Sequence, residues 1–112
     1  MKREKAMQLF HGVEKYNCAQ AILIAFREEY GVAQEQIDAS AALGRGKADE
    51  GRCGALHAGR ALLDDASSAQ NLENQFAAAA GSAKCREIRK LKRISCMECV
   101  GVAADLIEKI RK

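Results

Sequence analysis

Not one proline interrupts this chain of 112 residues, and no other feature constrains its fold as much. An average protein would carry about 5% proline. Threonine is absent as well, and valine and isoleucine are few, whereas alanine, the residue that favours helices most, occurs 21 times. The sequence therefore predicts helices throughout, and it argues against a β-sandwich or a β-barrel.

The length predicts one domain, a single cysteine-rich helical domain over residues 1–112. Its fold class is all-α, a compact bundle of about six to seven short helices joined by short turns. Leucine, isoleucine, valine and phenylalanine together number only 23, so large side chains for a core are scarce. A bound metal or a homodimer interface would therefore be a further source of stability.

Glycines and capping residues divide the chain into the expected helices. Asn17 is a good N-cap residue, Ser67 stands three residues before Gln70 as in a capping box, and Ser95 is expected to cap the last helix. Stops are expected at Gly12, Gly31, Gly44 and Gly81. The expected helices cover about residues 3–11, 17–30, 34–43, 53–65, 67–80 and 84–92, and a last one follows Ser95.

The chain shows no sign of a membrane segment or of a nucleic-acid partner. Its longest apolar run, from Cys18 to Phe26, is less than half of the ~20 residues that a membrane-spanning helix needs. No apolar signal segment follows the basic start, so we expect a cytoplasmic protein. A net charge of +3 is too small to indicate nucleic acid.

Two basic segments stand out within this modest net charge. Residues 84–93 hold six basic side chains and one acidic one, and Arg86, Arg89, Lys90 and Arg93 share one helical face. Such a face is usually solvated, and contact with an acidic redox partner protein is the alternative. The glycine-rich stretch before Cys53 carries Arg45, Lys47 and Arg52, which form either an exposed loop or a cationic rim that keeps Cys53 ionised.

The cysteines are the chemically informative residues. Five of them in so short a chain, in a reducing compartment, indicate metal binding or thiol chemistry in preference to a disulfide framework. Four stand in the first turn of an expected helix, where backbone amides and the helix dipole lower the pKa of a thiol. These four are Cys18, Cys53, Cys85 and Cys96, and Cys99 follows Cys96 by one helical turn.

Some familiar cysteine sites do not fit this pattern. Cys96 and Cys99 form a C-x-x-C pair, but no strand is expected beside them, as a thioredoxin-like site would require. Position 100 is valine, so the chain has no c-type haem motif. His57 stands four residues after Cys53, where it could be a weaker metal ligand, a base beside a nucleophile, or an ordinary surface histidine.

The order of these motifs resembles one known family. The strings are Tyr16-Asn17-Cys18-Ala19-Gln20-Ala21, Gly51-Arg52-Cys53-Gly54-Ala55-Leu56, Cys85-Arg86-Glu87 and Cys96-x-x-Cys99. From about Phe10 to Ile107 the chain resembles the bacterial and archaeal C_GCAxxG_C_C family, whose members are described as redox-active. The literal string GCAxxG is not present, because Arg52 precedes Cys53, Gly54 follows it and the next glycine is Gly59. The resemblance implies a redox role without naming a substrate.

Three functional hypotheses follow from the sequence. The preferred one gathers Cys18, Cys53, Cys85, Cys96 and Cys99 as thiolates around one site, as ligands of an iron–sulfur cluster or another metal. Thiol–disulfide exchange comes next, with Cys96 and Cys99 as the pair. The second hypothesis is a helical interaction module in which the cysteines are small core residues. The third is an enzyme with Cys53 as nucleophile, Cys96 and Cys99 as further reactive thiols, and His57 as base.

Overall fold

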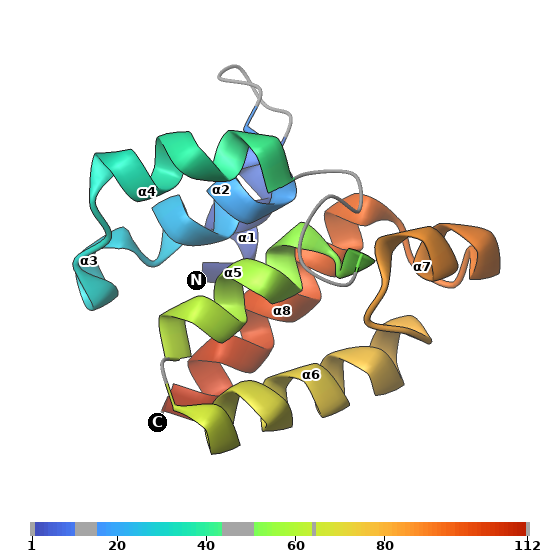
Figure 1. Ribbon diagram of the computed structural model, residues 1–112. Coiled ribbons are helices and arrows are strands. Elements are labelled where there is room, and N and C mark those ends of the chain that lie inside the picture. Colours follow the sequence, from blue (N-terminus) through green and yellow to red (C-terminus); the bar gives the residue numbers. More distant parts are fainter. Residues whose placement is uncertain (1, 11–15, 44–50, 64, 112) are drawn as a thin grey trace.

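The computed structural model describes residues 2–10, 16–43, 51–63 and 65–111 (Figure 1). Within these ranges the chain forms helices and no strand, so the predicted all-α fold is confirmed. The elements in chain order are α1 (Lys2–Leu9), α2 (Cys18–Ala25), α3 (Arg27–Tyr30), α4 (Gln34–Ala39), the 3-10 helix η1 (Ser40–Leu43), α5 (Gly54–Leu63), α6 (Ala66–Ala80), α7 (Cys85–Leu91) and α8 (Cys96–Arg111).

Two of the expected helices are divided in the structure, which is why it has more elements than predicted. The helix expected over residues 17–30 breaks at Phe26, whose backbone leaves the helical region while its ring is fully buried. The segment 34–43 tightens into η1 at Ser40, whose hydroxyl donates to the carbonyl of Gln36 at 2.9 Å. Such a side-chain bond competes with the helical hydrogen bonds of the backbone.

Helix ends follow the expected chemistry with one correction. The side chain of Asn17 caps α2 as predicted, and left-handed glycines end α3 at Gly31 and α6 at Gly81. The prediction that Ser67 caps α6 is wrong, because the carboxylate of Asp65 accepts from the amide of Ser68 at 2.9 Å. The expected stops at Gly12 and Gly44 lie outside the described residues.

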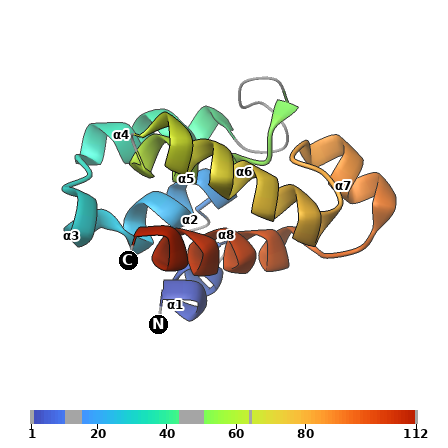
Figure 2. The ribbon, with the colours of Figure 1, turned by 90° about the horizontal axis from the view of Figure 1, so that it is seen from below.

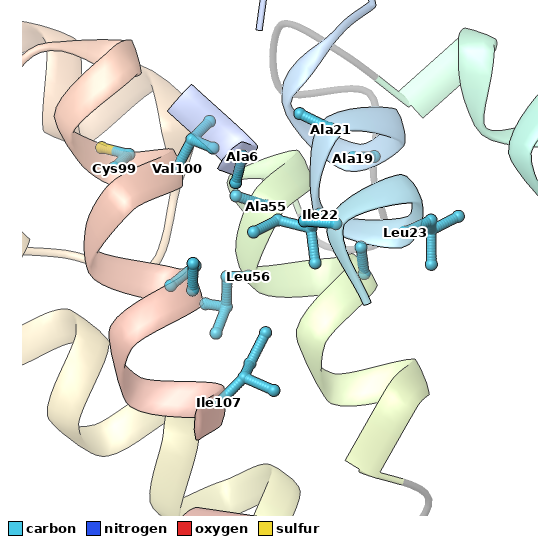
Figure 3. Close-up of a cluster of buried hydrophobic side chains, with 14 of the residues drawn as sticks. Ala6, Ala19, Ala21, Ile22, Leu23, Ala55, Leu56, Cys99, Val100 and Ile107 are labelled. Carbon is cyan, nitrogen blue, oxygen red and sulfur yellow. The ribbon is translucent and has the colours of Figure 1, made fainter. Parts of the chain in front are cut away.

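Helices α5 and α8 form the centre of the molecule (Figures 1 and 2). They pack against each other, α2 and α6 contact both of them, and α1 lies along α8. The core between them is built largely from alanine and medium-sized aliphatic residues, as Figure 3 shows for Ala6, Ile22, Ala55, Leu56, Val100 and Ile107. The abundance of alanine is therefore used for close helix packing, and few large side chains are needed.

Gly59 on α5 is the tightest point of this packing. A Cβ atom at this position would lie 2.8 Å from Leu72 of α6 and 2.9 Å from Ile107 of α8. Both neighbours are fully buried, so they have little room to move. A residue without a side chain is therefore required for three helices to meet here.

Helix α7 stands at the side of this bundle (Figures 1 and 2). Ile88 is its single buried residue, with 2% of its surface exposed. The segment just before α7 is tied to the rest of the molecule, because the amide of Cys53 donates to the carbonyl of Ala83 at 2.9 Å. This tie brings the beginning of α7 next to the beginning of α5.

Candidate redox site

All five cysteines line one cavity of about 840 Å³. Cys18, Cys85 and Cys96 are the first residues of α2, α7 and α8, and Cys53 immediately precedes α5. The N-terminal ends of four helices therefore converge on the cavity, and Cys99 reaches it from the second turn of α8. All five are free thiols in the structure.

A network around Asn17 holds Cys18 at the cavity. The side-chain oxygen of Asn17 accepts from the amide of Gln20 at 2.8 Å, and the side chain of Gln20 accepts from the amide of Asn17 at 3.1 Å. The Asn17 amide group also donates to the carbonyls of Ser40 and Ala41 at 2.9 and 3.0 Å. Asn17 thus caps α2 and joins it to η1, which explains why asparagine precedes this cysteine.

A second capping box places Cys96 and Cys99. The Ser95 hydroxyl accepts from the amide of Glu98 at 3.1 Å, and the Glu98 carboxylate accepts from the amide of Ser95 at 2.8 Å. The bond from the Ser95 amide is also the main reason that the pKa of Glu98 is lowered. This box fixes the start of α8, so Cys96 lies half-buried at the cavity and Cys99 faces the core (Figure 3).

Three of the thiols are close enough to influence one another. Cys53 interacts with Cys18 on one side and with Cys99 on the other, so the ionisation of one of these thiols changes the pKa of the next. Cys53 and Cys99 are buried, with 5% and 2% of their surfaces exposed. We call Cys18, Cys53 and Cys99 the inner thiols, and Cys53 is the one that contacts both of the others.

The predicted lowering of the thiol pKa is wrong for the three cysteines whose shift is resolved. The neighbouring thiol of Cys53, then burial, raises the pKa of Cys18 far above its ordinary value. For Cys53 the neighbouring thiol of Cys18 lowers the pKa, but the thiol of Cys99 and burial raise it, to about 12. Burial raises the pKa of Cys85, although Arg89 opposes this.

Helix amides do act on these sulfurs, but they are not the strongest influence. The amides of Ala55 and Ala19 lower the pKa of Cys18, and the amide of Leu56 lowers that of Cys53. Their effect is smaller than that of neighbouring thiols and of burial, which both disfavour a second negative charge in the same space. Cys18 and Cys53 are therefore protonated at neutral pH.

A comparison with models of protein families identifies the family to which this chain belongs. The model of the family described as "Putative redox-active protein (C_GCAxxG_C_C)" matches residues 16–110. The chain belongs to the C_GCAxxG_C_C family. No curated protein and no solved structure matches it.

The family match spans every residue of the inner thiols and also Cys85 and Cys96. It includes Gly59 as well, which the packing of α5 against α6 and α8 requires. In this member of the C_GCAxxG_C_C family, Cys53 and Gly59 thus have different roles. Cys53 lines the cavity, and Gly59 lets α5 approach α6 and α8.

Several residues singled out in the sequence do not line the cavity. His57 is half-buried on α5 and is not among the lining residues, so its role as ligand or base stays a prediction. Arg52 binds Glu73 of α6 through a 2.8 Å ion pair, and Glu73 also binds Arg60 at 2.9 Å. Arg45 and Lys47 lie outside the described residues.

The sequence did not assign the basic segment 84–93 to the cysteine site, but three of its cations line the cavity. They are Arg89, Lys92 and Arg93. Arg89 lies beside Cys96 in the wall of the cavity, and its interaction with this thiol is the main reason that the pKa of Arg89 is raised. The sequence could have indicated that Arg89 lies near the cysteines, because it follows Cys85 by four residues and a helix brings such positions together.

The described residues contain no group of three or more His, Cys, Asp or Glu side chains arranged to hold a single metal ion. The thiols instead lie around the walls of the cavity. Among the helices of the described ranges, none has the length and apolar character that crossing a lipid bilayer requires.

Proposed function

We propose that this member of the C_GCAxxG_C_C family is a thiol–disulfide redox protein that stores two electrons in its inner thiols. The observation that carries the proposal is the position of Cys53, which lines the same cavity as Cys18 and Cys99 and interacts with both of them. Thiols gathered in this way need only a limited movement to reach the geometry of a disulfide. Either Cys53–Cys18 or Cys53–Cys99 is the product.

The reaction is an exchange with an external disulfide. A cavity thiol, acting as its thiolate, attacks one sulfur of the external disulfide, and the other sulfur leaves and takes up the proton. A second cysteine then attacks the mixed disulfide, forms an internal disulfide and releases the second external thiol. Two cysteines lose two electrons, and the external disulfide gains them.

Burial protects the inner thiols between such reactions. Because Cys53 and Cys99 are buried and Cys53 is protonated, small oxidants reach this pair slowly. Cys96 is half-buried and lies beside Arg89, so it is the better placed thiol to meet a partner. Cys99 follows one turn later on the same helix and contacts Cys53, which gives a route from the cavity to the inner thiols.

The test is a redox titration in buffers of graded thiol and disulfide ratio, followed by mapping of the cross-linked peptides. We expect one reversible internal disulfide that contains Cys53. Cys53→Ser should abolish it, whereas the control Cys85→Ser should retain it. If Cys53 stays reduced at all ratios while the protein remains folded, the proposal fails.

An iron–sulfur cluster is the second candidate, and the collection of five thiols on one cavity favours it. The donor chemistry fits, because thiolates hold such clusters, and thiols spread around a cavity suit a polynuclear cluster better than a single ion. Four of the five cysteines, Cys18, Cys53, Cys85, Cys96 and Cys99, would supply the ligands, and the group would supply one-electron transfer. Arg89, Lys92 and Arg93 would offset the negative charge of the thiolates.

Protein purified without oxygen distinguishes the two candidates. Stoichiometric iron and acid-labile sulfide with a visible absorption band would favour the cluster and exclude free inner thiols as the resting state. Colourless protein with five titratable thiols after denaturation, and no metal taken up on reconstitution, would favour the disulfide function. The variants Cys18→Ser and Cys53→Ser are expected to change the outcome together, because both side chains line the same cavity.

A further inference from the structure

The mouth of the cysteine cavity carries an excess of positive charge. Arg89, Lys92 and Arg93 line it, and none of the three forms an ion pair with any carboxylate of the described residues. Among the described residues that line it, Glu98 is the one acidic side chain, and its carboxylate is bound to the amide of Ser95. Cations that form no ion pair with a carboxylate and lie beside a cavity can bind an anion.

The size and the remaining walls of the cavity indicate what kind of anion fits. A volume of about 840 Å³ lies within the ~300–1,000 Å³ that small-molecule sites occupy. Phe10, Ile88 and Ile94 provide apolar walls next to the thiols. The cavity therefore combines apolar surface, thiols and cations, as a small molecule with a hydrocarbon arm, a sulfur group and an anionic end would require.

We propose that the substrate is a low-molecular-weight disulfide that carries carboxylates, held by Arg89, Lys92 and Arg93 while its sulfur reacts with Cys96. This inference rests on the proposed thiol–disulfide function and names its substrate class. Arg89 is the central residue, since it lines the cavity together with Cys96 and interacts with this thiol. An anion bound by this cation group lies beside the reacting thiol.

The reaction balances within this site. The Cys96 thiolate attacks the substrate disulfide, the bond between the two substrate sulfurs breaks, and one carboxylate-bearing thiol leaves with a proton from solvent. Cys99, in its thiolate form, attacks the sulfur of Cys96 and displaces the other carboxylate-bearing thiol. The Cys53 thiolate then attacks the sulfur of Cys99 and releases Cys96 as a free thiol, so that the disulfide Cys53–Cys99 remains. The substrate is reduced to two thiols, and two cysteines are oxidised to one disulfide.

Three disulfides of similar length but different charge test the proposal. Dithiodipropionate is anionic, bis(hydroxyethyl) disulfide is neutral and cystamine is cationic. Each rate of oxidation of the reduced protein at low salt is divided by the rate of the same disulfide with N-acetylcysteinamide, which removes intrinsic reactivity. We expect the normalised rate of the anion to exceed that of the cation by on the order of tenfold or more, and the difference to shrink in high salt.

Two matched double variants identify which cations cause the preference for the anionic disulfide. Arg89→Gln with Arg93→Gln should remove most of the preference for the anion. Arg86→Gln with Lys90→Gln changes the net charge equally on the same segment but at residues that do not line the cavity, so the preference should remain. Circular dichroism would confirm that both variants are folded. The comparison of the three disulfides with the wild-type protein does not depend on these variants.

Equal normalised rates for the three disulfides, or equal loss in both double variants, would overturn the inference. Formation of the internal disulfide in those same reactions would leave the proposed function intact. If no disulfide formed with any probe, the proposed function itself would fail. The two failures are therefore distinguishable in one set of measurements.

Discussion

Cys53 shows how the chemistry of a single residue depends on what faces it. Its position just before α5 exposes the sulfur to helix amides, which favour a thiolate. The same position brings it against Cys99 and out of water, and these effects are stronger. A thiol that is held protonated contributes to stability in a way that depends on pH.

We predict that the folded protein loses stability in alkaline solution as Cys53 ionises. The pKa of Cys53 in the folded state is raised from 9.0 to about 12. The stabilising contribution is therefore complete below about pH 9 and is lost as the pH rises towards 12. Urea unfolding at a series of pH values would show this loss, and Cys53→Ala should have a shallower one. Parallel curves for the two proteins would contradict the prediction.

At the residue scale the sequence predicted where the cysteines stand but not their protonation. Helix starts can be read from Asn17 and Ser95, because capping depends on neighbours along the chain. The contact of Cys53 with Cys18 and Cys99 joins residues that are far apart in sequence. Only the folded arrangement reveals it, and with it the raised pKa.

Helix α2 depends on a capping residue that also joins it to another element. Asn17→Ser keeps an oxygen for the amide of Gln20 but loses the donor to Ser40 and Ala41. We predict that Asn17→Ser costs about 1 kcal/mol, for the lost hydrogen bonds, and Asn17→Ala about 1 kcal/mol more, for the lost cap. Chemical denaturation measures both. Equal costs would mean that the cap contributes nothing.

Helix α5 is predicted to tolerate no side chain at Gly59. Gly59→Ala gains about 1 kcal/mol of helix propensity but overpacks Leu72 and Ile107, which costs typically ~1–3 kcal/mol. We expect net destabilisation. Gly101→Ala on α8 is the matched control, because its new Cβ meets the ends of Met7 and Arg3, which can move. Thermal unfolding of both variants would decide, and a stabilised Gly59→Ala would contradict the packing argument.

At the element scale the sequence predicted the all-α fold and most helix starts, while the divisions within helices needed the structure. The break at Phe26 follows from burying its ring, and the tightening at Ser40 from its bond to Gln36. Asp65 and Ser67 lie two residues apart, and either one could cap the start of α6; in the structure Asp65 does so. Both candidates are good capping residues, so local chemistry alone does not choose between them.

Helix α7 forms part of the cavity wall, but it buries only one of its side chains against the rest of the molecule. Ile88 is buried, whereas Leu91 on the same helix is 57% exposed. We predict that Ile88→Ala weakens the docking of α7 by about 2 kcal/mol, so that local opening becomes at least about tenfold more frequent. Faster hydrogen exchange in α7 and faster labelling of Cys53 would show this.

Leu91→Ala is the control for this change, because it removes a side chain of similar size from the exposed face. It should leave both the exchange in α7 and the labelling of Cys53 unchanged. If Ile88→Ala also left them unchanged while the protein stayed folded, α7 would be held by contacts other than Ile88. The access to the inner thiols would then have to lie elsewhere.

The long sequence separation between α1 and α8, which lie side by side, has a consequence for the newly made protein. Arg3 of α1 pairs with Asp105 of α8 at 2.6 Å, so α1 can complete its packing only when α8 is present. Cys18 and Cys53 are synthesised well before Cys96 and Cys99. The nascent chain therefore exposes its early sulfurs until α8 has left the ribosome.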